Sequence, residues 1–184
     1  MKLILITGMP GSGKDELCKV AAQMGVSVVR MGYLVRAEAL KRRIHFSDSN
    51  VGGFAASERH KHGFGIWAER TLKHLDGGLE IVLVNGIRCP EEVEVFRKGL
   101  PDSGVAVIAL HSSPATRRER LMRRGRGDDV ATDDEFAARD RRELEWGLGE
   151  VIACADEVLV NEGTLEELGA NVRALIGRLT GAGR

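Results

Sequence analysis

The stretch Gly8-Met9-Pro10-Gly11-Ser12-Gly13-Lys14-Asp15 decides the fold of this 184-residue chain. It follows an apolar run at 3–7, which predicts a short buried strand, and leads into 16–22, whose spacing and composition predict a helix. Strand, glycine-rich loop, lysine and helix, in this order, are the context of a phosphate-binding loop. The glycines let successive backbone N–H groups point toward a polyphosphate, and Lys14 supplies a cation. We therefore predict a polyphosphate site here rather than a plain glycine turn.

The composition limits the class of protein. The chain is 43% hydrophobic and its 27 Lys and Arg residues balance 27 Asp and Glu residues. These values suit one compact α/β domain and argue against a globally basic nucleic-acid binder. Three widely spaced cysteines form neither a disulfide framework nor a zinc site. No apolar stretch reaches the roughly 18 residues of a membrane span, and the start lacks the layout of a signal peptide. We expect a soluble, cytoplasmic protein.

Five short apolar runs, rich in Val, Ile and Leu, predict parallel strands that are covered on both faces. The runs lie at 3–7, 26–30, 81–85, 105–111 and 157–160. Helical patterns lie at 13–24, 31–43, 55–75, 90–98, 114–124, 133–148 and 164–179. This alternation predicts an open, doubly wound α/β sheet, in which ligands bind at the carboxyl ends of the strands.

Arginines gather where such a ligand is expected. Arg36 and Arg88 follow the second and third predicted strands, and the segment 117–126 holds six arginines and one glutamate. Guanidinium groups suit phosphate because they can make two parallel hydrogen bonds to its oxygens. For any one of these arginines, an ion pair with a neighbouring carboxylate is an equally open interpretation. A solvated basic helix face is likewise open for 117–126.

Several segments together resemble one family. They are the phosphate loop, Met31–Arg36, Asn85-Gly86-Ile87-Arg88, Arg124-Gly125-Arg126-Gly127-Asp128-Asp129, Arg139-Asp140-Arg141-Arg142-Glu143-Leu144 and the stretch from Trp146 to Gly163. Over essentially the whole chain, the sequence resembles a poorly characterised archaeal group of P-loop proteins similar to adenylate kinase and dephospho-coenzyme A kinase. The resemblance implies a P-loop NTPase fold in one domain, 1–184, with a five-stranded parallel sheet flanked by helices. It also implies an arginine-rich lid at about 124–142.

The resemblance further implies roles for individual residues, with ATP and Mg²⁺ as cofactors. The β- and γ-phosphates of ATP would be held by Gly8, Pro10, Gly11, Ser12, Gly13 and Lys14. Catalytic charge would come from Lys14, Arg88, Arg120, Arg124 and Arg126. The acceptor would be bound by Arg36, Arg88 and Arg139, with Arg139 and Arg142 entering from the far side of the lid. Tyr33 is a further candidate for binding the acceptor: it either stacks on an acceptor base or covers the core. Asn161 lies where related kinases contact the adenine base.

Three positions depart from the pattern of related kinases. Asp15 replaces the usual hydroxyl residue after the loop lysine, Tyr33 replaces an acid after Gly32, and Asn85 replaces the acid that ends the third strand. Our hypothesis is that the metal-binding carboxylate has moved from position 85 to Asp15. The opposing interpretation is that Asp15 repels phosphate and the site has decayed.

These features favour an ATP-dependent phosphotransferase acting on a small acceptor, with a nucleoside monophosphate as the first candidate. A dephospho-coenzyme A kinase is the nearest alternative, but its sugar hydroxyl needs a general base, for which Asp128, Asp129 and Asp140 are the candidates. A nucleotide-dependent switch with weak ATPase activity is another alternative. We expect no nucleic-acid or membrane partner, because no aromatic stacking set accompanies the arginines, and we expect a monomer or homodimer.

Overall fold

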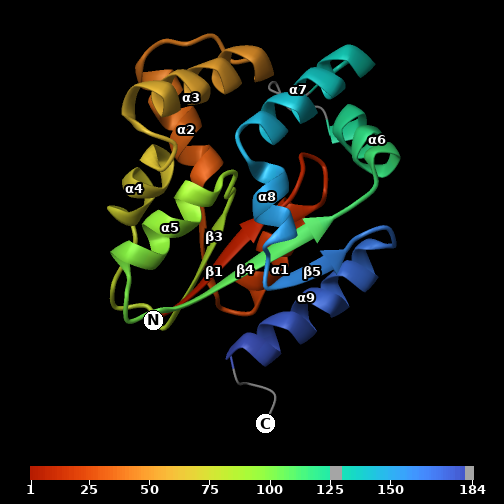
Figure 1. Cartoon of the computed structure of the whole chain (residues 1–184). Coiled ribbons are helices and arrows are strands. Elements are labelled where there is room, and N and C mark those ends of the chain that lie inside the picture. Colours follow the sequence, from red (N-terminus) through yellow and green to blue (C-terminus); the bar gives the residue numbers. More distant parts are fainter. Residues whose placement is uncertain (125–129, 181–184) are drawn as a thin grey trace.

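A computed structural model describes residues 1–124 and 130–180 of the chain (Figure 1). Its centre is a five-stranded sheet in the order β2-β3-β1-β4-β5, in which every neighbouring pair is parallel. The strands are β1 (Lys2–Thr7), β2 (Ser27–Arg30), β3 (Ile81–Asn85), β4 (Gly104–His111) and β5 (Glu157–Val160). This arrangement confirms the predicted doubly wound α/β fold.

Helices cover both faces of the sheet, and alternate residues of the central strand serve the two resulting cores. Leu3 and Leu5 face one core, while Ile4 and Ile6 face the other. Core residues of the first face come from α2 (Met31–Lys41), α3 (Asp48–His62), α4 (Ile66–Leu72), α5 (Pro90–Gly99) and α8 (Leu148–Ala153). Those of the second face come from α1 (Lys14–Gln23) and α9 (Leu165–Thr180). Burial on both faces explains why the strands read as continuous apolar runs.

The predicted single helix at 55–75 is wrong. The chain forms α3 from Asp48 and a separate α4, and the break falls at Gly63-Phe64-Gly65. Gly63 has a φ of 95°, which favours glycine and ends the first helix. The early start of α3 was also missed, although Ser47 caps it by accepting a hydrogen bond from the Asn50 backbone N–H at 3.2 Å.

The predicted helix at 133–148 forms but ends a few residues early, and a second short helix that follows it was missed. The first, α7 (Asp133–Glu145), begins with a capping box formed by Thr132 and Glu135. It ends before Gly147, whose φ of 98° turns the chain into α8. The remaining expected helices agree with the structure within a few residues, including α6 (Pro114–Arg124). The predicted lid at 124–142 includes 125–129, which lie outside the described residues.

The strand order decides where a ligand can bind. Because β1 lies between β3 and β4, the loops that follow these three strands meet at one edge of the sheet. Figure 1 shows α6 and α7 on one side of this edge and α2 and α3 on the other. No helix of the described part of the chain is long and apolar enough to cross a membrane.

Replacing Leu5, which is fully buried on the central strand, by alanine should lower the free energy of unfolding by about 2–5 kcal/mol. The loss has two parts, the transfer of the removed methyl groups and the cavity that they leave. Leu40→Ala is the matched control, because Leu40 is 74% exposed on α2, and it should change stability by less than about 0.5 kcal/mol. Urea unfolding followed by circular dichroism measures both, and equal losses would contradict the described core.

Candidate active site

The phosphate-binding loop connects β1 to α1 and depends on its glycines. Gly8, Gly11 and Gly13 all have positive φ, at 138°, 82° and 100°. A side chain at Gly8 would run into the Leu110 carbonyl oxygen, and one at Gly11 would lie 2.7 Å from the Arg117 carbonyl oxygen. The loop therefore needs glycine both for its backbone conformation and for its close contact with β4 and α6.

Lys14 begins α1, and its ammonium group lies within the loop. Its Nζ donates to the carbonyl oxygens of Gly8 at 2.5 Å and Met9 at 2.9 Å. Burial and, next, the positive charge of Arg88 together lower the pKa of Lys14 to about 7, although Asp15 opposes the shift. A lysine held within a backbone loop of this shape suits a bound polyphosphate.

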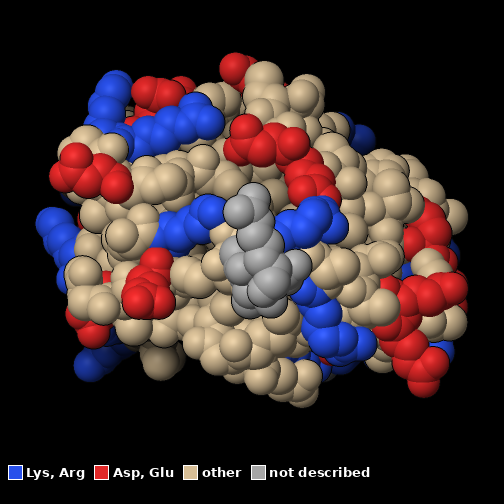
Figure 2. Space-filling model, turned by 90° about the horizontal axis from the view of Figure 1, so that it is seen from below, with Lys and Arg blue, Asp and Glu red and all other residues tan. Residues whose placement is uncertain are grey.

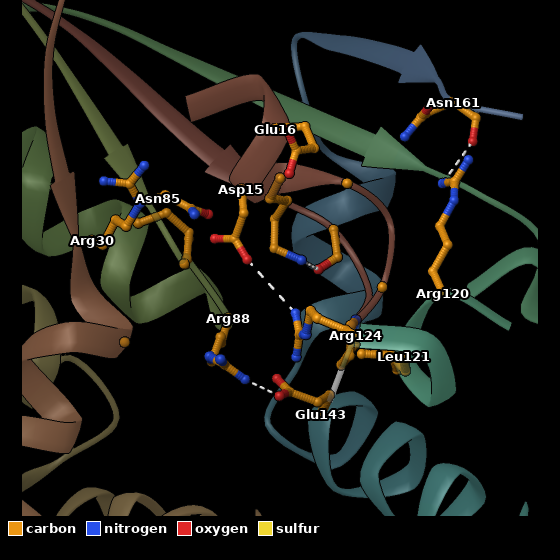
Figure 3. Close-up of a pocket in the computed structure, with 18 of the residues that line it drawn as sticks. Asp15, Glu16, Arg30, Asn85, Arg88, Arg120, Leu121, Arg124, Glu143 and Asn161 are labelled. Carbon is orange, nitrogen blue, oxygen red and sulfur yellow. Dashed lines mark hydrogen bonds and ion pairs between the residues drawn. The ribbon is translucent and has the colours of Figure 1, made fainter. Parts of the chain in front are cut away.

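The loop is held from behind by the chain that follows β4 and β5. Asn161, which is 5% exposed, donates from its amide to the Ser12 carbonyl oxygen at 2.9 Å. Arg120 donates to the Ser112 hydroxyl at 2.9 Å and to the Asn161 carbonyl oxygen at 3.1 Å. Both residues line the cavity, but their hydrogen bonds support the loop (Figure 3).

A second support was not found from the sequence. Arg117 on α6 donates to the Pro10 carbonyl oxygen at 3.1 Å and makes two hydrogen bonds to Asp140 of α7, at 2.9 and 2.6 Å. Arg117 is 3% exposed, so this two-pronged pair ties both helices to the phosphate loop. Asp140, one of the candidate general bases for a hydroxyl acceptor, therefore forms an ion pair with Arg117.

A cavity of about 310 Å³ opens in front of the loop (Figure 3). It gathers most of the residues singled out in the sequence, and these are Gly8, Pro10, Gly11, Gly13, Lys14, Asp15, Tyr33, Arg36, Arg88, Arg120, Arg124, Arg139 and Asn161. Ser12 is fully buried behind the lining. Arg126, Asp128 and Asp129 lie outside the described residues. Tyr33 is 58% exposed, with the Arg30 guanidinium 5.4 Å from its ring centre.

Arg88 lies at the centre of a network of charges. Its side chain forms an ion pair with Glu143 of α7, and its backbone N–H donates to Glu92 at 2.7 Å (Figure 3). Glu92 is fully buried and also accepts from Arg59 of α3 at 2.8 Å. Burial lowers the pKa of Arg88 to about 9, and the neighbouring charges of Arg59 and Arg139 add to this lowering.

A smaller recess of about 60 Å³ shares Arg88 and Glu143 with the main cavity. Asp48, at the start of α3, binds Arg139 at 3.2 Å and Arg142 at 2.7 Å, both on α7. Gly52 makes room for this contact, since a side chain there would lie 2.6 Å from the Arg142 guanidinium carbon.

Trp146 forms an aromatic wall of the same recess. The guanidinium groups of Arg59, Arg88 and Arg142 lie 4.3, 5.7 and 5.7 Å from its ring centre. Sequence reasoning missed Asp48, Arg59, Glu92 and Glu143 as parts of the site. No local pattern marks Asp48, Arg59 or Glu143, because their partners lie far away in the chain; Glu92 contacts the nearby Arg88 backbone as well as the distant Arg59.

The residues near Lys14 suit a hard cation. Asp15 lines the cavity and lies 3.6 Å from Arg124, and Asn85 is 7% exposed with a buried side-chain oxygen that accepts no hydrogen bond. A carboxylate and an amide oxygen are ligands that Mg²⁺ accepts. Among the described residues no three His, Cys, Asp or Glu side chains form a metal group, so phosphate oxygens and water would supply the remaining ligands.

The arginines of 117–126 divide between the site and ordinary ion pairs. Arg118 pairs with Asp133, and Arg123 lies 2.7 Å from Glu119 on the same helix. Arg117, Arg120 and Arg124 turn instead toward the phosphate loop and its neighbours. Because of these contacts, the segment is not a uniform basic face. The face drawn in Figure 2, seen from below the view of Figure 1, also carries basic and acidic side chains side by side.

Comparison with known proteins agrees with this fold. The model of the AAA domain family matches residues 4–143. The UPF0200 protein of Hyperthermus butylicus is 46% identical over 182 residues, covering 98% of this chain and 96% of the relative. The UPF0200 protein of Pyrococcus abyssi is 41% identical over 180 residues, covering 96% of each chain.

Solved structures with this fold include small-molecule kinases. A gluconokinase from Sinorhizobium meliloti has a TM-score of 0.59 at 19% identity, covering 97% of this chain and 93% of its own. A shikimate kinase from Acinetobacter baumannii, in complex with shikimate, has a TM-score of 0.60 at 16% identity, covering 96% and 93%. These similarities concern the fold alone. With relatives above 40% identity over nearly its full length, the chain belongs to the UPF0200 family of archaeal proteins and carries an AAA-type P-loop domain.

Proposed function

We propose that this protein is an ATP-dependent phosphotransferase that moves the γ-phosphate of ATP to a small acceptor, with a nucleoside monophosphate as the first candidate. One observation carries the proposal: the phosphate loop with Lys14 faces arginines from α2, the loop after β3, α6 and α7 across a single cavity. Positioning and charge stabilisation are what phosphoryl transfer requires of a protein. Kinases among proteins of the same fold support this assignment.

The proposed roles follow from the positions of the side chains. The loop N–H groups and Lys14 bind the β- and γ-phosphates, while Arg36 and Arg88 orient the acceptor in line. Arg124 and Arg139 lie beside the cavity and offset charge on the transferring group. Asp15 and Asn85 hold Mg²⁺, which supplies charge neutralisation on the phosphate oxygens when bound. The cavity lies between α2, α6 and α7, whose side chains would limit the access of water to the transferring phosphoryl group.

A phosphate acceptor fits better than a sugar hydroxyl. A hydroxyl needs a carboxylate to take its proton, and of the three candidate bases the structure describes Asp140, which both terminal nitrogens of Arg117 hold. Acceptor phosphate oxygens are already anionic, so they require no base. Binding through arginine also favours a phosphate group, because the fork of a guanidinium matches two phosphate oxygens.

Turnover with Mg-ATP and a panel of ribo- and deoxyribonucleoside monophosphates and dephospho-coenzyme A tests the proposal. One acceptor should yield its phosphorylated product well above the others. Lys14→Met should lower that rate about 100-fold or more, because it removes a charge that stabilises the transition state. Lys19→Met on the same helix is the control, since Lys19 is exposed and, within the described part of the chain, pairs with Glu16, 2.7 Å away. Slow hydrolysis that no acceptor stimulates would instead indicate a nucleotide-dependent switch.

Proton uptake on ATP binding tests the position of Lys14. With a pKa of about 7, Lys14 is mostly uncharged at pH 8 in the free protein. Bound phosphates favour its charged form and raise this pKa, so binding at pH 8 should take up close to one proton. At pH 5.5 Lys14 is charged in both states and takes up none. ATP affinity should therefore fall as the pH rises above 7.

Calorimetric titration in two buffers with different ionisation enthalpies measures this uptake. The Lys14→Met variant, if it still binds ATP, should show no uptake at pH 8. An equal uptake in the variant and in the unchanged protein would assign the proton to another group.

Asp15→Ser should reduce the gain in ATP affinity that Mg²⁺ provides by about tenfold, because it removes the proposed metal carboxylate. Asn85→Asp in the Asp15→Ser background should restore part of this gain. Titration of a fluorescent ATP analogue with Mg²⁺ and with a chelator separates the metal effect from the loss of the Arg124 contact, which acts in both conditions. If neither substitution alters the Mg²⁺ dependence of ATP affinity, the hypothesis of a relocated metal-binding carboxylate is wrong.

A further inference from the structure

We propose that Glu143 is a specificity-determining residue: its carboxylate occupies the place of the acceptor's anionic group on Arg88, and a dianionic phosphate displaces it. This inference rests on the proposed function and names the acceptor class as phosphate monoesters, as opposed to carboxylates. Glu143 acts as an internal competitor that a stronger anion must replace.

The first argument is the position of Glu143. It extends from α7 to Arg88 and lines both the main cavity and the smaller recess (Figure 3). Its residue surface is 2% exposed, so solvent does not compete for the carboxylate. The guanidinium of Arg88 faces the cavity that contains the phosphate loop, and this group is the one that Glu143 engages.

The second argument is that Glu143 is only half satisfied. One of its oxygens accepts from Arg88, while the other is buried and accepts no hydrogen bond. A buried carboxylate oxygen without a donor is unfavourable and calls for a specific explanation.

Other buried or half-buried carboxylates of the region use both oxygens. Glu92 accepts from Arg59 and from the Arg88 backbone, and Asp140 accepts twice from Arg117. Asp48 faces Arg139 with one oxygen and Arg142 with the other. These pairs have the geometry of permanent structural contacts. The Glu143 pair differs, and its single-pronged contact is the one most readily exchanged.

The third argument is the charge of the recess. Its lining contains five arginines and two carboxylates, namely Arg36, Arg59, Arg88, Arg139, Arg142, Asp48 and Glu143. Glu92, which is not part of the lining, forms an ion pair with Arg59 and so neutralises one more of these positive charges. Arginines therefore outnumber carboxylates in this lining, and the imbalance increases when Glu143 leaves Arg88.

This arrangement discriminates between anions by charge. A carboxylate from a ligand carries the same charge as Glu143 and gains little by replacing it. A phosphate dianion interacts more strongly with the clustered guanidinium groups and offers more oxygens to them. Every acceptor must break the same contact between Arg88 and Glu143. A phosphate monoester, however, forms stronger interactions with the arginines than the contact that it breaks.

Phosphate binding to the protein with its donor site filled by Mg²⁺ and a non-hydrolysable ATP analogue tests this inference. In calorimetric titrations with inorganic phosphate, Glu143→Gln should bind on the order of tenfold more tightly than the unchanged protein, because the competing charge is gone. Glu145→Gln is the matched control, since Glu145 is exposed on the same helix, and it should leave the affinity unchanged. Arg88→Ala should abolish the signal and so assign it to this recess.

Acetate provides the test of selectivity, and Glu143→Asp provides a second variant that keeps the charge. The unchanged protein should bind phosphate but not acetate, and Glu143→Gln should gain measurable acetate binding. The shorter aspartate side chain of Glu143→Asp reaches Arg88 less well, so this variant should increase phosphate affinity by a smaller factor. It keeps the inference testable if Glu143→Gln fails to fold.

Unchanged or weaker phosphate binding in both Glu143 variants would overturn the inference. A collapse of turnover at unchanged phosphate affinity would also overturn it, by assigning Glu143 to proton transfer. These titrations need no transferase activity. Failure of the ATP analogue to bind would contradict the proposed function. Phosphate binding by the Glu143 variants can still be compared on the nucleotide-free protein, with Arg88→Ala as the reference.

Discussion

Repulsion among buried cations is the constraint on which the arrangement of this cavity depends. Lys14 and Arg88 have lowered pKa values because burial removes water and because neighbouring arginines oppose their charge. Such a cluster persists only where carboxylates compensate it. Here they are supplied by α3, α5 and α7, through Asp48, Glu92 and Glu143. The positions of these helices around the site are thus tied to the charge that the site concentrates.

The same pairs connect parts of the molecule that the sheet alone would leave independent. Asp48 of α3 binds two arginines of α7, so the helices on opposite sides of the cavity contact each other directly. Arg117 and Asp140 in turn link α6 and α7 to the phosphate loop. Separation of α3 from α7 to admit a ligand must therefore break ion pairs near the site, and ionic strength becomes a variable in the access of ligands.

The sequence predicts the fold and the phosphate loop well, because both depend on local signals. The spacing from Gly8 to Lys14 after a buried strand is visible in seven residues, and the apolar runs mark all five strands. Gly63 and Gly147 were less informative, since a glycine within a helical pattern is tolerated in some proteins and ends the helix in others. Their positive φ values could only be read from the structure.

The arginines of the site could be predicted, but their partners could not. Arg88 and Glu143 are 55 positions apart, and Asp48 and Arg142 are 94 apart. Such pairs depend on how helices pack, which no spacing rule supplies. Asn161 illustrates a related limit, because its place after β5 was predictable whereas its amide contact with the Ser12 carbonyl oxygen was not.

The placement of Trp146 has a further consequence. Three guanidinium groups of the smaller recess approach its ring, and one of them, Arg88, is the partner of Glu143. The other tryptophan, Trp67, is 1% exposed in the core and donates to the Ala55 carbonyl oxygen at 3.3 Å. Trp67 has the Arg70 guanidinium 4.8 Å from its ring centre, but both residues lie outside the lining of the smaller recess. Because indole emission responds to nearby charge, Trp146 is an intrinsic optical reporter of guanidinium movement in that recess.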